Sequence, residues 1–284
     1  MRSTRFSEQL ADAEASNDSV LCVGLDPDPA KFPGSWKDDA GRIFDFCATI
    51  VDATKDLVIA FKPQIAYFAA NRAEEQLERL IAYIHRVAPG LPVILDAKRG
   101  DVGSTAQQYA REAFERYQAD AVTLSPFMGL DSIEPFLRYT GKGAILLCRT
   151  SNAGGADLQG QRLGTHDTVY EHIAKLAQTS WNQGGQLALV VGATFPGEIA
   201  RVRELAPTLP LLVPGIGAQG GDEAQTVRAG WRWESGRTVA PIIVSSSRAI
   251  LYASRGEDFA QAARAQALAT RATLNSARNE LRQR

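Results

Sequence analysis

The chain has 284 residues, a length that fits one α/β barrel or two smaller domains. Its 31 basic and 32 acidic residues give a formal net charge of −1, which excludes the strongly basic surface of a typical nucleic-acid-binding protein. No stretch approaches 18 uninterrupted apolar residues and the first ten lack the apolar core of a signal peptide, so we expect no membrane partner. The three cysteines are widely spaced without a Cys-x-x-Cys pair, which predicts neither a disulfide framework nor a zinc site and favours a reducing cytoplasm.

Eight short apolar runs, each bounded by Gly, Pro or charged residues, recur through the whole chain. Each run is almost continuously hydrophobic, a pattern typical of strands in a parallel sheet that helices cover. The runs are residues 21–24, 58–61, 92–95, 121–124, 143–148, 187–191, 211–213 and 240–244.

Segments with helical spacing lie between these runs, as in Leu77, Leu80, Ile81 and Ile84. Eight strands alternating with helices, at about 36 residues per unit, is the rhythm of the (β/α)8 barrel, or TIM barrel, within the α/β class. A doubly wound open sheet uses the same alternation, and periodicity alone does not separate the two. Because no change of composition divides the chain, we predict a single barrel domain over residues 1–284, with a C-terminal helix at about 257–281.

The most informative motif is Asp-x-Lys-x-x-Asp at the end of the third run. Asp96 and Lys98 are two residues apart, so on a strand their side chains project to the same face. Asp101 follows on the next loop, and Lys62 lies at the equivalent end of the preceding strand. Two carboxylates and two ammonium groups are therefore expected to converge at one rim of the barrel.

Such an alternation of charge suggests a particular chemistry. A lysine between carboxylates is held protonated, and two neighbouring carboxylates repel each other unless cations lie between them. A substrate anion placed against Asp96 would be repelled, which favours loss of that anionic charge, and Lys98 is a candidate proton donor to the carbon left behind. These are the tools of a decarboxylation. An ordinary surface ion-pair cluster is the alternative, but charge at the carboxyl ends of barrel strands is typical of function.

A phosphate site is predicted on the loops after the seventh and eighth runs. Residues 213–222 are rich in glycine, and Ser245-Ser246-Ser247-Arg248 follows the last run. Glycines let backbone N–H groups approach an anion, and an arginine binds it bidentately. A tight turn is the alternative for the glycine loop. Asp26 is a further candidate site residue, because this carboxylate also follows a strand, the first one, just before a proline turn. The alternative is that Asp26 only caps that turn.

Two other candidate sites are set aside. His85, His166 and His172 are too scattered for a metal triad, so no metal site is predicted. Trp231 and Trp233 more often indicate packing than base stacking in a nearly neutral protein.

At the level of motifs, the chain resembles the orotidine 5′-phosphate decarboxylase family, in particular its longer bacterial form. The Asp-x-Lys-x-x-Asp core alone is shared with sugar-phosphate synthases and decarboxylases on related barrels, whereas the additional blocks are specific. The matching blocks, in family order, are Gly24-Leu25-Asp26, Phe61-Lys62-Pro63, residues 96–105, Val191-Gly192-Ala193-Thr194, residues 214–221 and Ser247-Arg248.

The resemblance implies a carboxy-lyase that converts orotidine 5′-phosphate to uridine 5′-phosphate and CO2, the last step of de novo pyrimidine nucleotide biosynthesis, without metal or organic cofactor. It implies that Lys98 protonates C6 and that Asp96 lies beside the substrate carboxylate. Lys62 and Asp101 would complete the charge network. Asp101 and Thr105 are expected to reach the active site of the other subunit, so that a homodimer shares its active sites.

The resemblance also implies the substrate contacts. Asp26 and Lys62 would bind ribose hydroxyls, and Ser151 would bind the pyrimidine amide. Gln219 and Arg248 would bind the phosphate and its closing loop. The full set of implied substrate-binding residues is Asp26, Thr105, Ser151, Pro214, Gln219, Ser247 and Arg248.

Two other functions stay open at this point. One is a magnesium-dependent sugar-phosphate aldolase or decarboxylase of the same barrel superfamily, with the Asp and Lys residues holding metal and enediolate. The other is a noncatalytic barrel that binds a phosphate ligand, although four converging charges exceed what one phosphate requires. Ser104 and Gln107 also have capping-box spacing, so Thr105 could simply belong to a helix start.

Overall fold

The computed structural model describes residues 5–164, 166–217 and 220–283 of the chain. Within these ranges, eight parallel strands form one sheet in the order β2-β1-β10-β7-β6-β5-β4-β3. Each strand overlaps one of the eight predicted runs. The strands are β1 (Leu21–Leu25), β2 (Ala60–Pro63), β3 (Ile94–Arg99), β4 (Ala121–Leu124), β5 (Gly143–Arg149), β6 (Leu187–Val191), β7 (Leu211–Pro214) and β10 (Ile242–Ser246).

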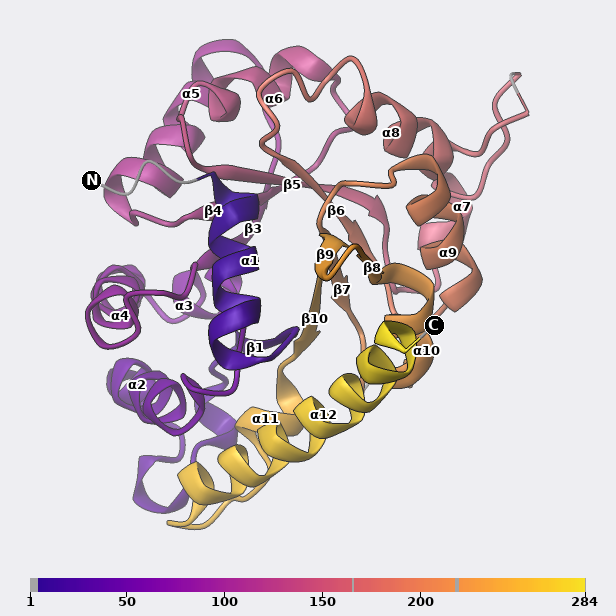
Figure 1. The fold of residues 1–284 in the computed structure, drawn as a ribbon. Coiled ribbons are helices and arrows are strands. Elements are labelled where there is room, and N and C mark those ends of the chain that lie inside the picture. The colour runs from indigo at the N-terminus through magenta and orange to yellow at the C-terminus, as the bar shows by residue number, and fades with distance from the viewer. Residues whose placement is uncertain (1–4, 165, 218–219, 284) are drawn as a thin grey trace.

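The two outer strands of this order, β2 and β3, meet and close the sheet. Isolated bridges join Phe61 to Val93 and Gln64 to Asp96. The N–H of Phe61 also donates to the carbonyl of Pro92 at 3.2 Å. The sheet therefore curls into a nearly closed barrel, which Figure 1 shows with helices around it. The predicted TIM barrel is confirmed, and the open doubly wound sheet is wrong.

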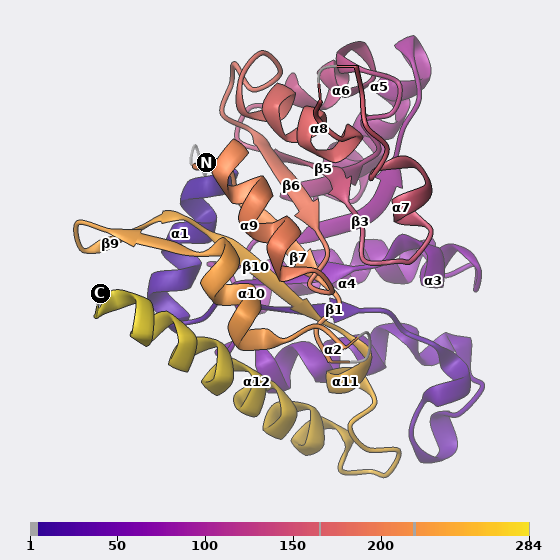
Figure 2. The same ribbon diagram turned by 90° about the vertical axis from the view of Figure 1, so that its right-hand side faces the viewer.

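Helices connect the strands and cover the outside of the barrel (Figures 1 and 2). In α4, for example, the predicted stripe of Leu77, Leu80, Ile81 and Ile84 is buried. The helices are α1 (Phe6–Asn17), α2 (Ile43–Thr54), α3 (Ile65–Ala69), α4 (Glu74–Val87), α5 (Gly103–Arg111), α6 (Leu130–Leu137), α7 (Gly155–Leu158), α8 (Val169–Gln178), α9 (Pro196–Leu205), α10 (Glu223–Gly230), α11 (Arg248–Leu251) and α12 (Phe259–Arg282).

Helix α1 covers the end of the barrel where the strands begin. Its Phe6 ring lies against Gly143 at the start of β5, where an added Cβ would come within 2.5 Å of the ring. At the other end of α1, Asn17 donates from its side-chain amide to the carbonyl of Val58 at 2.8 Å, just before β2. The amino-terminal helix is thus fitted to the floor of the barrel.

A two-stranded hairpin before β10, β8 (Arg232–Glu234) and β9 (Arg237–Ala240), was not predicted. It helps enclose a group of side chains around Glu14 of α1, here called the Glu14 cluster. One carboxylate oxygen of Glu14 accepts from Trp231 Nε1 at 3.1 Å, Thr238 Oγ1 at 2.7 Å and Arg278 Nη2 at 2.8 Å. Trp231 is fully buried, as expected for a packing residue.

The helix start near Thr105 is found, but its predicted cap is not. Helix α5 begins at Gly103 with Val102 as its N-cap, and no side chain caps it. The Ser104–Gln107 capping box is therefore wrong, because both residues lie inside the helix rather than at positions N-cap and N3.

No helix in the described part of the chain combines the length and apolarity needed to cross a bilayer.

Candidate active site

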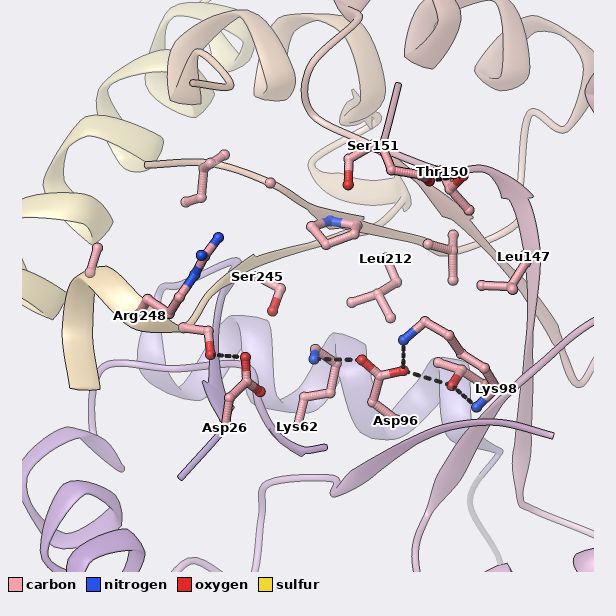
Figure 3. Close-up of a pocket in the computed structure, with 18 residues that line it drawn as sticks. Asp26, Lys62, Asp96, Lys98, Leu147, Thr150, Ser151, Leu212, Ser245 and Arg248 are labelled. Carbon is pink, nitrogen blue, oxygen red and sulfur yellow. Dashed lines mark hydrogen bonds and ion pairs between the residues drawn. The ribbon is translucent and has the colours of Figure 1, made fainter. Parts of the chain in front are cut away.

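A cavity of about 470 Å³ opens at the carboxyl ends of the strands (Figure 3). This is the end at which barrels carry their functional loops. Most of the predicted site residues meet here, although they come from six different strand ends. The predicted residues that line the cavity are Asp26, Lys62, Asp96, Lys98, Ser151, Pro214, Ser247 and Arg248.

Three of these side chains form a row of alternating charge, which Figure 3 shows across the cavity floor. Lys62 Nζ donates to Asp96 Oδ2 at 2.9 Å, and Lys98 Nζ donates to Asp96 Oδ1 at 2.6 Å. The Lys62 and Asp96 side chains are only 7% and 11% exposed, whereas that of Lys98 is 48% exposed. The row therefore runs from a buried cation, through a buried carboxylate, to a cation that faces the open cavity.

The protonation of this row follows from its own charges. Burial alone would raise the pKa of the Asp96 carboxyl, but the charges and hydrogen bonds of Lys62 and Lys98 outweigh burial and hold this pKa well below its usual range. Burial alone would lower the pKa of the Lys62 ammonium, but Asp96 and Asp26 outweigh it and hold this pKa above its usual range. Both Asp96 and Lys62 are thus charged at neutral pH.

Asp26, just after β1, is held by two residues that follow β10. Ser247 Oγ donates to Asp26 Oδ2 at 2.5 Å, and the Tyr252 hydroxyl donates to the Asp26 carbonyl at 2.7 Å. A Cβ on Gly24 would lie 2.9 Å from the Ser247 side chain, so glycine permits this approach. The capping role belongs to Asp28, whose carboxylate accepts from Ala30 N at 3.2 Å. The turn-cap alternative for Asp26 is therefore wrong.

The predicted phosphate side is built from the ends of β7 and β10. Pro214, Gly215 and Ile216 line the cavity together with Arg248, whose exposed side chain stands at the start of α11 (Figure 3). Gly215 has φ of +107°, a backbone conformation that favours glycine. Gln219 was predicted on this loop and lies outside the described residues.

The wall opposite Arg248 carries the loop after β5. Thr150, Ser151 and Asn152 line the cavity there. Thr194 Oγ1 donates to the Ser151 carbonyl at 3.4 Å, and a Cβ on Gly192 would come within 2.6 Å of Ser151 Cα. The predicted Val-Gly-Ala-Thr block thus supports the backbone that presents Ser151.

Two predicted site residues do not line this cavity. Asp101 accepts from the backbone N–H of Val102 at 2.8 Å, and Thr105 is exposed on α5. The same surface exposes large apolar side chains: Val102 is 48%, Phe127 79% and Met128 41% exposed. In the single chain, only Asp96, Lys98 and Lys62 of the four predicted charges converge.

Other lining residues were missed by the sequence analysis. Thr123, Leu147, Val190 and Leu212 belong to strands that were recognised only as apolar runs. The available signal was a hydroxyl inside such a run, as in Thr123 of the fourth run. Leu147 and Leu212 carry no local signal, because core and cavity-lining leucines look alike in sequence.

Among the described residues, no three His, Cys, Asp or Glu side chains are grouped as metal ligands.

Comparison with known proteins gives one consistent family. Residues 19–265 match the family described as Orotidine 5′-phosphate decarboxylase / HUMPS family. The chain is 73% identical over 276 residues to the orotidine 5′-phosphate decarboxylase of Methylibium petroleiphilum, covering 96% of this chain and 99% of that one. It is 74% identical to the protein of the same name in Leptothrix cholodnii, covering 96% and 97%.

Solved structures agree with the sequence relatives. The OMP decarboxylase of Leishmania donovani is 38% identical with a TM-score of 0.79, covering 95% of this chain and 99% of that one. A solved chain from Toxoplasma gondii is 34% identical with a TM-score of 0.87, covering 99% and 98%. Both likenesses extend over the whole barrel.

Proposed function

Because this chain belongs to the orotidine 5′-phosphate decarboxylase family, we propose that its cavity converts orotidine 5′-phosphate to uridine 5′-phosphate and CO2 in pyrimidine nucleotide biosynthesis. The protein is a carboxy-lyase. The observation that carries the proposal is the placement of the Asp96 side chain between the ammonium groups of Lys62 and Lys98 on the floor of the cavity. The magnesium-dependent aldolase and the noncatalytic barrel are not favoured.

The row of charges suggests how the C6–carboxylate bond breaks. With the substrate carboxylate beside Asp96, like-charge repulsion favours loss of CO2, and the bonding electron pair stays on C6. The Lys98 ammonium stabilises this carbanion and then gives C6 a proton, after which solvent reprotonates the amine. Since a preorganised cation acts where charge develops, we assign more of the rate to Lys98 than to repulsion at Asp96.

Lys62 keeps this arrangement intact. Without its ammonium at 2.9 Å, Asp96 would be a buried carboxylate paired on one side only. We assign ribose hydroxyls to Lys62 and Asp26, the phosphate to Arg248 with Pro214, Ser247 and Gln219, and the pyrimidine amide to Ser151. Arg248 and Ser151 line separate walls of the cavity, which supports placing the phosphate and the pyrimidine on opposite sides of the ribose (Figure 3).

We further propose a homodimer in which Asp101 and Thr105 complete the cavity of the second copy. The exposed Val102, Phe127 and Met128 beside them supply the apolar surface that such an interface buries. Mixing Lys98→Ala with Asp101→Ala protein tests this sharing. If sites are shared, each mixed dimer contains one intact site, and up to about a quarter of the wild-type activity should return. No recovery after subunit exchange would contradict it.

We also propose that residues 1–284 fold as one domain and that the enzyme works in the cytoplasm. The three cysteines, Cys22, Cys47 and Cys148, are buried and form no disulfide, which supports a reducing compartment.

The deciding experiment follows the change in absorbance of orotidine 5′-phosphate on addition of purified protein, with and without EDTA. Turnover that is insensitive to the chelator is the expected result. Turnover lost with EDTA would favour the metal-dependent alternative. Tight binding of uridine 5′-phosphate without any turnover would favour the noncatalytic barrel.

A further inference from the structure

The geometry points to Thr123 of β4 as a positioning residue for this decarboxylation, acting through Asp96 and the backbone of Lys98. The inference rests on the proposed function, because it concerns the same charges. Thr123 lines the cavity floor but is only 1% exposed, so its effect comes through its neighbours.

The hydroxyl of Thr123 fills a gap in the sheet. Leu95 pairs with Val122 and Arg99 pairs with Leu124, so three residues of β3 stand opposite the single residue Thr123 of β4. A bulge of this kind leaves backbone groups without a ladder partner. Thr123 Oγ1 accepts from the N–H of Ala97 at 3.0 Å and of Lys98 at 2.9 Å, and so replaces the missing carbonyl.

The bulge also holds Lys98 in an unusual conformation. Lys98 has φ of +46°, in the left-handed region that residues other than glycine rarely adopt. Such a conformation costs energy and persists only where the surroundings fix it. The bond from Lys98 N to Thr123 is one of the contacts that fix it.

The remaining bond of the hydroxyl is directed by the first two. A threonine hydroxyl has two acceptor lone pairs and one donor hydrogen. Since the two N–H groups occupy both lone pairs, the hydrogen is left for Asp96 Oδ1, 2.9 Å away. This bond favours the ionised carboxylate and orients it so that Oδ1 meets Lys98 Nζ while Oδ2 meets Lys62 Nζ.

One side chain therefore sets both partners of the catalytic pair: the carboxylate of Asp96 directly and the lysine through its main chain. Removing the hydroxyl would leave two N–H groups unpaired and let Asp96 rotate. Because rates depend on sub-ångström placement of the proton donor, the loss should appear in kcat more than in KM.

Thr123→Val tests this inference, because valine keeps the shape and removes the hydroxyl. We expect kcat to fall about ten- to a hundredfold, the range for losing a hydrogen bond to a charged group, while KM changes by less than about threefold. Thr123→Ser keeps the hydroxyl and should retain kcat within about threefold of the wild type. A Thr123→Val variant with wild-type kcat, or equal losses in both variants, would overturn the assignment.

Thr226→Val is the matched control. Thr226 of α10 is also fully buried, and its hydroxyl has no hydrogen-bond partner among the described residues. The same chemical change there should leave kcat unchanged. If Thr226→Val lowered kcat as much as Thr123→Val, the effect would belong to general packing and the inference would fail.

If Thr123→Val does not fold, Thr123→Cys is compared with Thr123→Ser, because a thiol is only a weak donor and acceptor. Equal kcat in these two variants would then overturn the inference. Failure of the proposed function itself is distinguishable, since it would appear as wild-type protein without turnover of orotidine 5′-phosphate.

Discussion

At the carboxyl ends of the strands, Asp96 is held between Lys62 and Lys98, and at the opposite end of the barrel Glu14 is held among Trp231, Thr238 and Arg278. Both carboxylates are buried, at 8% and 4% exposure, and both accept several hydrogen bonds. The two regions differ in what lies beside them. Lys98 faces a cavity, whereas the Arg278 side chain is 1% exposed and packs over the Trp231 ring.

The comparison shows that a buried charge cluster does not by itself indicate chemistry. In the Glu14 cluster, donors from Trp231, Thr238 and Arg278 meet on one carboxylate oxygen, so the group fastens α1, the hairpin and α12 together. In the Asp96 row, one charged end is left for a ligand. Function is indicated by the combination of stored charge, an adjoining cavity and a cation that reaches into it.

The largest expected effect separates the two regions by activity. Lys98→Ala should lower kcat/KM by at least about a thousandfold, because it removes both the proton donor and the cation beside the developing carbanion. The fold should survive, since the Lys98 side chain is 48% exposed. Absorbance assays and circular dichroism measure the two properties. Lys55→Ala is the control, because Lys55 lies in an exposed pair with Asp52 and its loss should leave kcat/KM unchanged. Wild-type turnover in Lys98→Ala would show that Lys98 is not part of the mechanism.

A second variant should separate the regions by stability. Arg278→Ala leaves Glu14 buried without its cation, so we expect the free energy of unfolding to fall by about 3–5 kcal/mol, with kcat unchanged for the folded protein. Urea denaturation measures the first quantity. Arg264→Ala on the same helix removes an exposed pair with Asp56 and should cost about 1 kcal/mol or less. Equal losses in both variants would show that the Glu14 cluster has no special role.

Arg248→Ala should produce a smaller effect at the open end of the cavity. We expect KM for orotidine 5′-phosphate to rise about ten- to a hundredfold, because one charge-assisted contact to the phosphate is lost. The value of kcat should change much less. Steady-state kinetics measures both parameters, and an unchanged KM would remove Arg248 from the phosphate site.

The smallest expected effect concerns pH. Since the folded-state pKa of Asp96 lies below its unfolded value, its contribution to stability is present above about pH 4 and is lost as pH falls toward the folded-state pKa. Below about pH 4, the free energy of unfolding should therefore fall more steeply with decreasing pH in the wild type than in Asp96→Asn. The two slopes should differ by up to about 1.4 kcal/mol per pH unit. Denaturation at several acidic pH values measures the two slopes, and parallel slopes would contradict the pKa direction.

Much of the barrel was predictable because its strands are continuous apolar runs that end in charge. That same feature located Asp96, Lys98 and Lys62, since charge at the end of a buried run is rare without a reason. Thr123 and Leu147 were missed because their runs look like ordinary core strands. The hairpin has strands of only three and four residues, too short for a clear pattern.

The Glu14 cluster was not predictable for a different reason. Its hydrogen bonds join Glu14 to residues 217, 224 and 264 positions away along the chain. No local pattern reports such pairings, and a glutamate in an amphipathic helix is expected on the surface. The proposed sharing of cavities between subunits cannot be read from one chain, which shows only that Asp101 and Thr105 do not line its own cavity.

The buried thiol of Cys22 can report how often the barrel opens. Burial raises the pKa of the Cys22 thiol on β1 to about 12, so in the closed barrel this group is neither accessible nor ionised. An alkylating reagent can therefore label Cys22 only in molecules whose first strand has come loose. The labelling rate would therefore measure how often the barrel opens near Lys62 and Asp96, without any engineered probe.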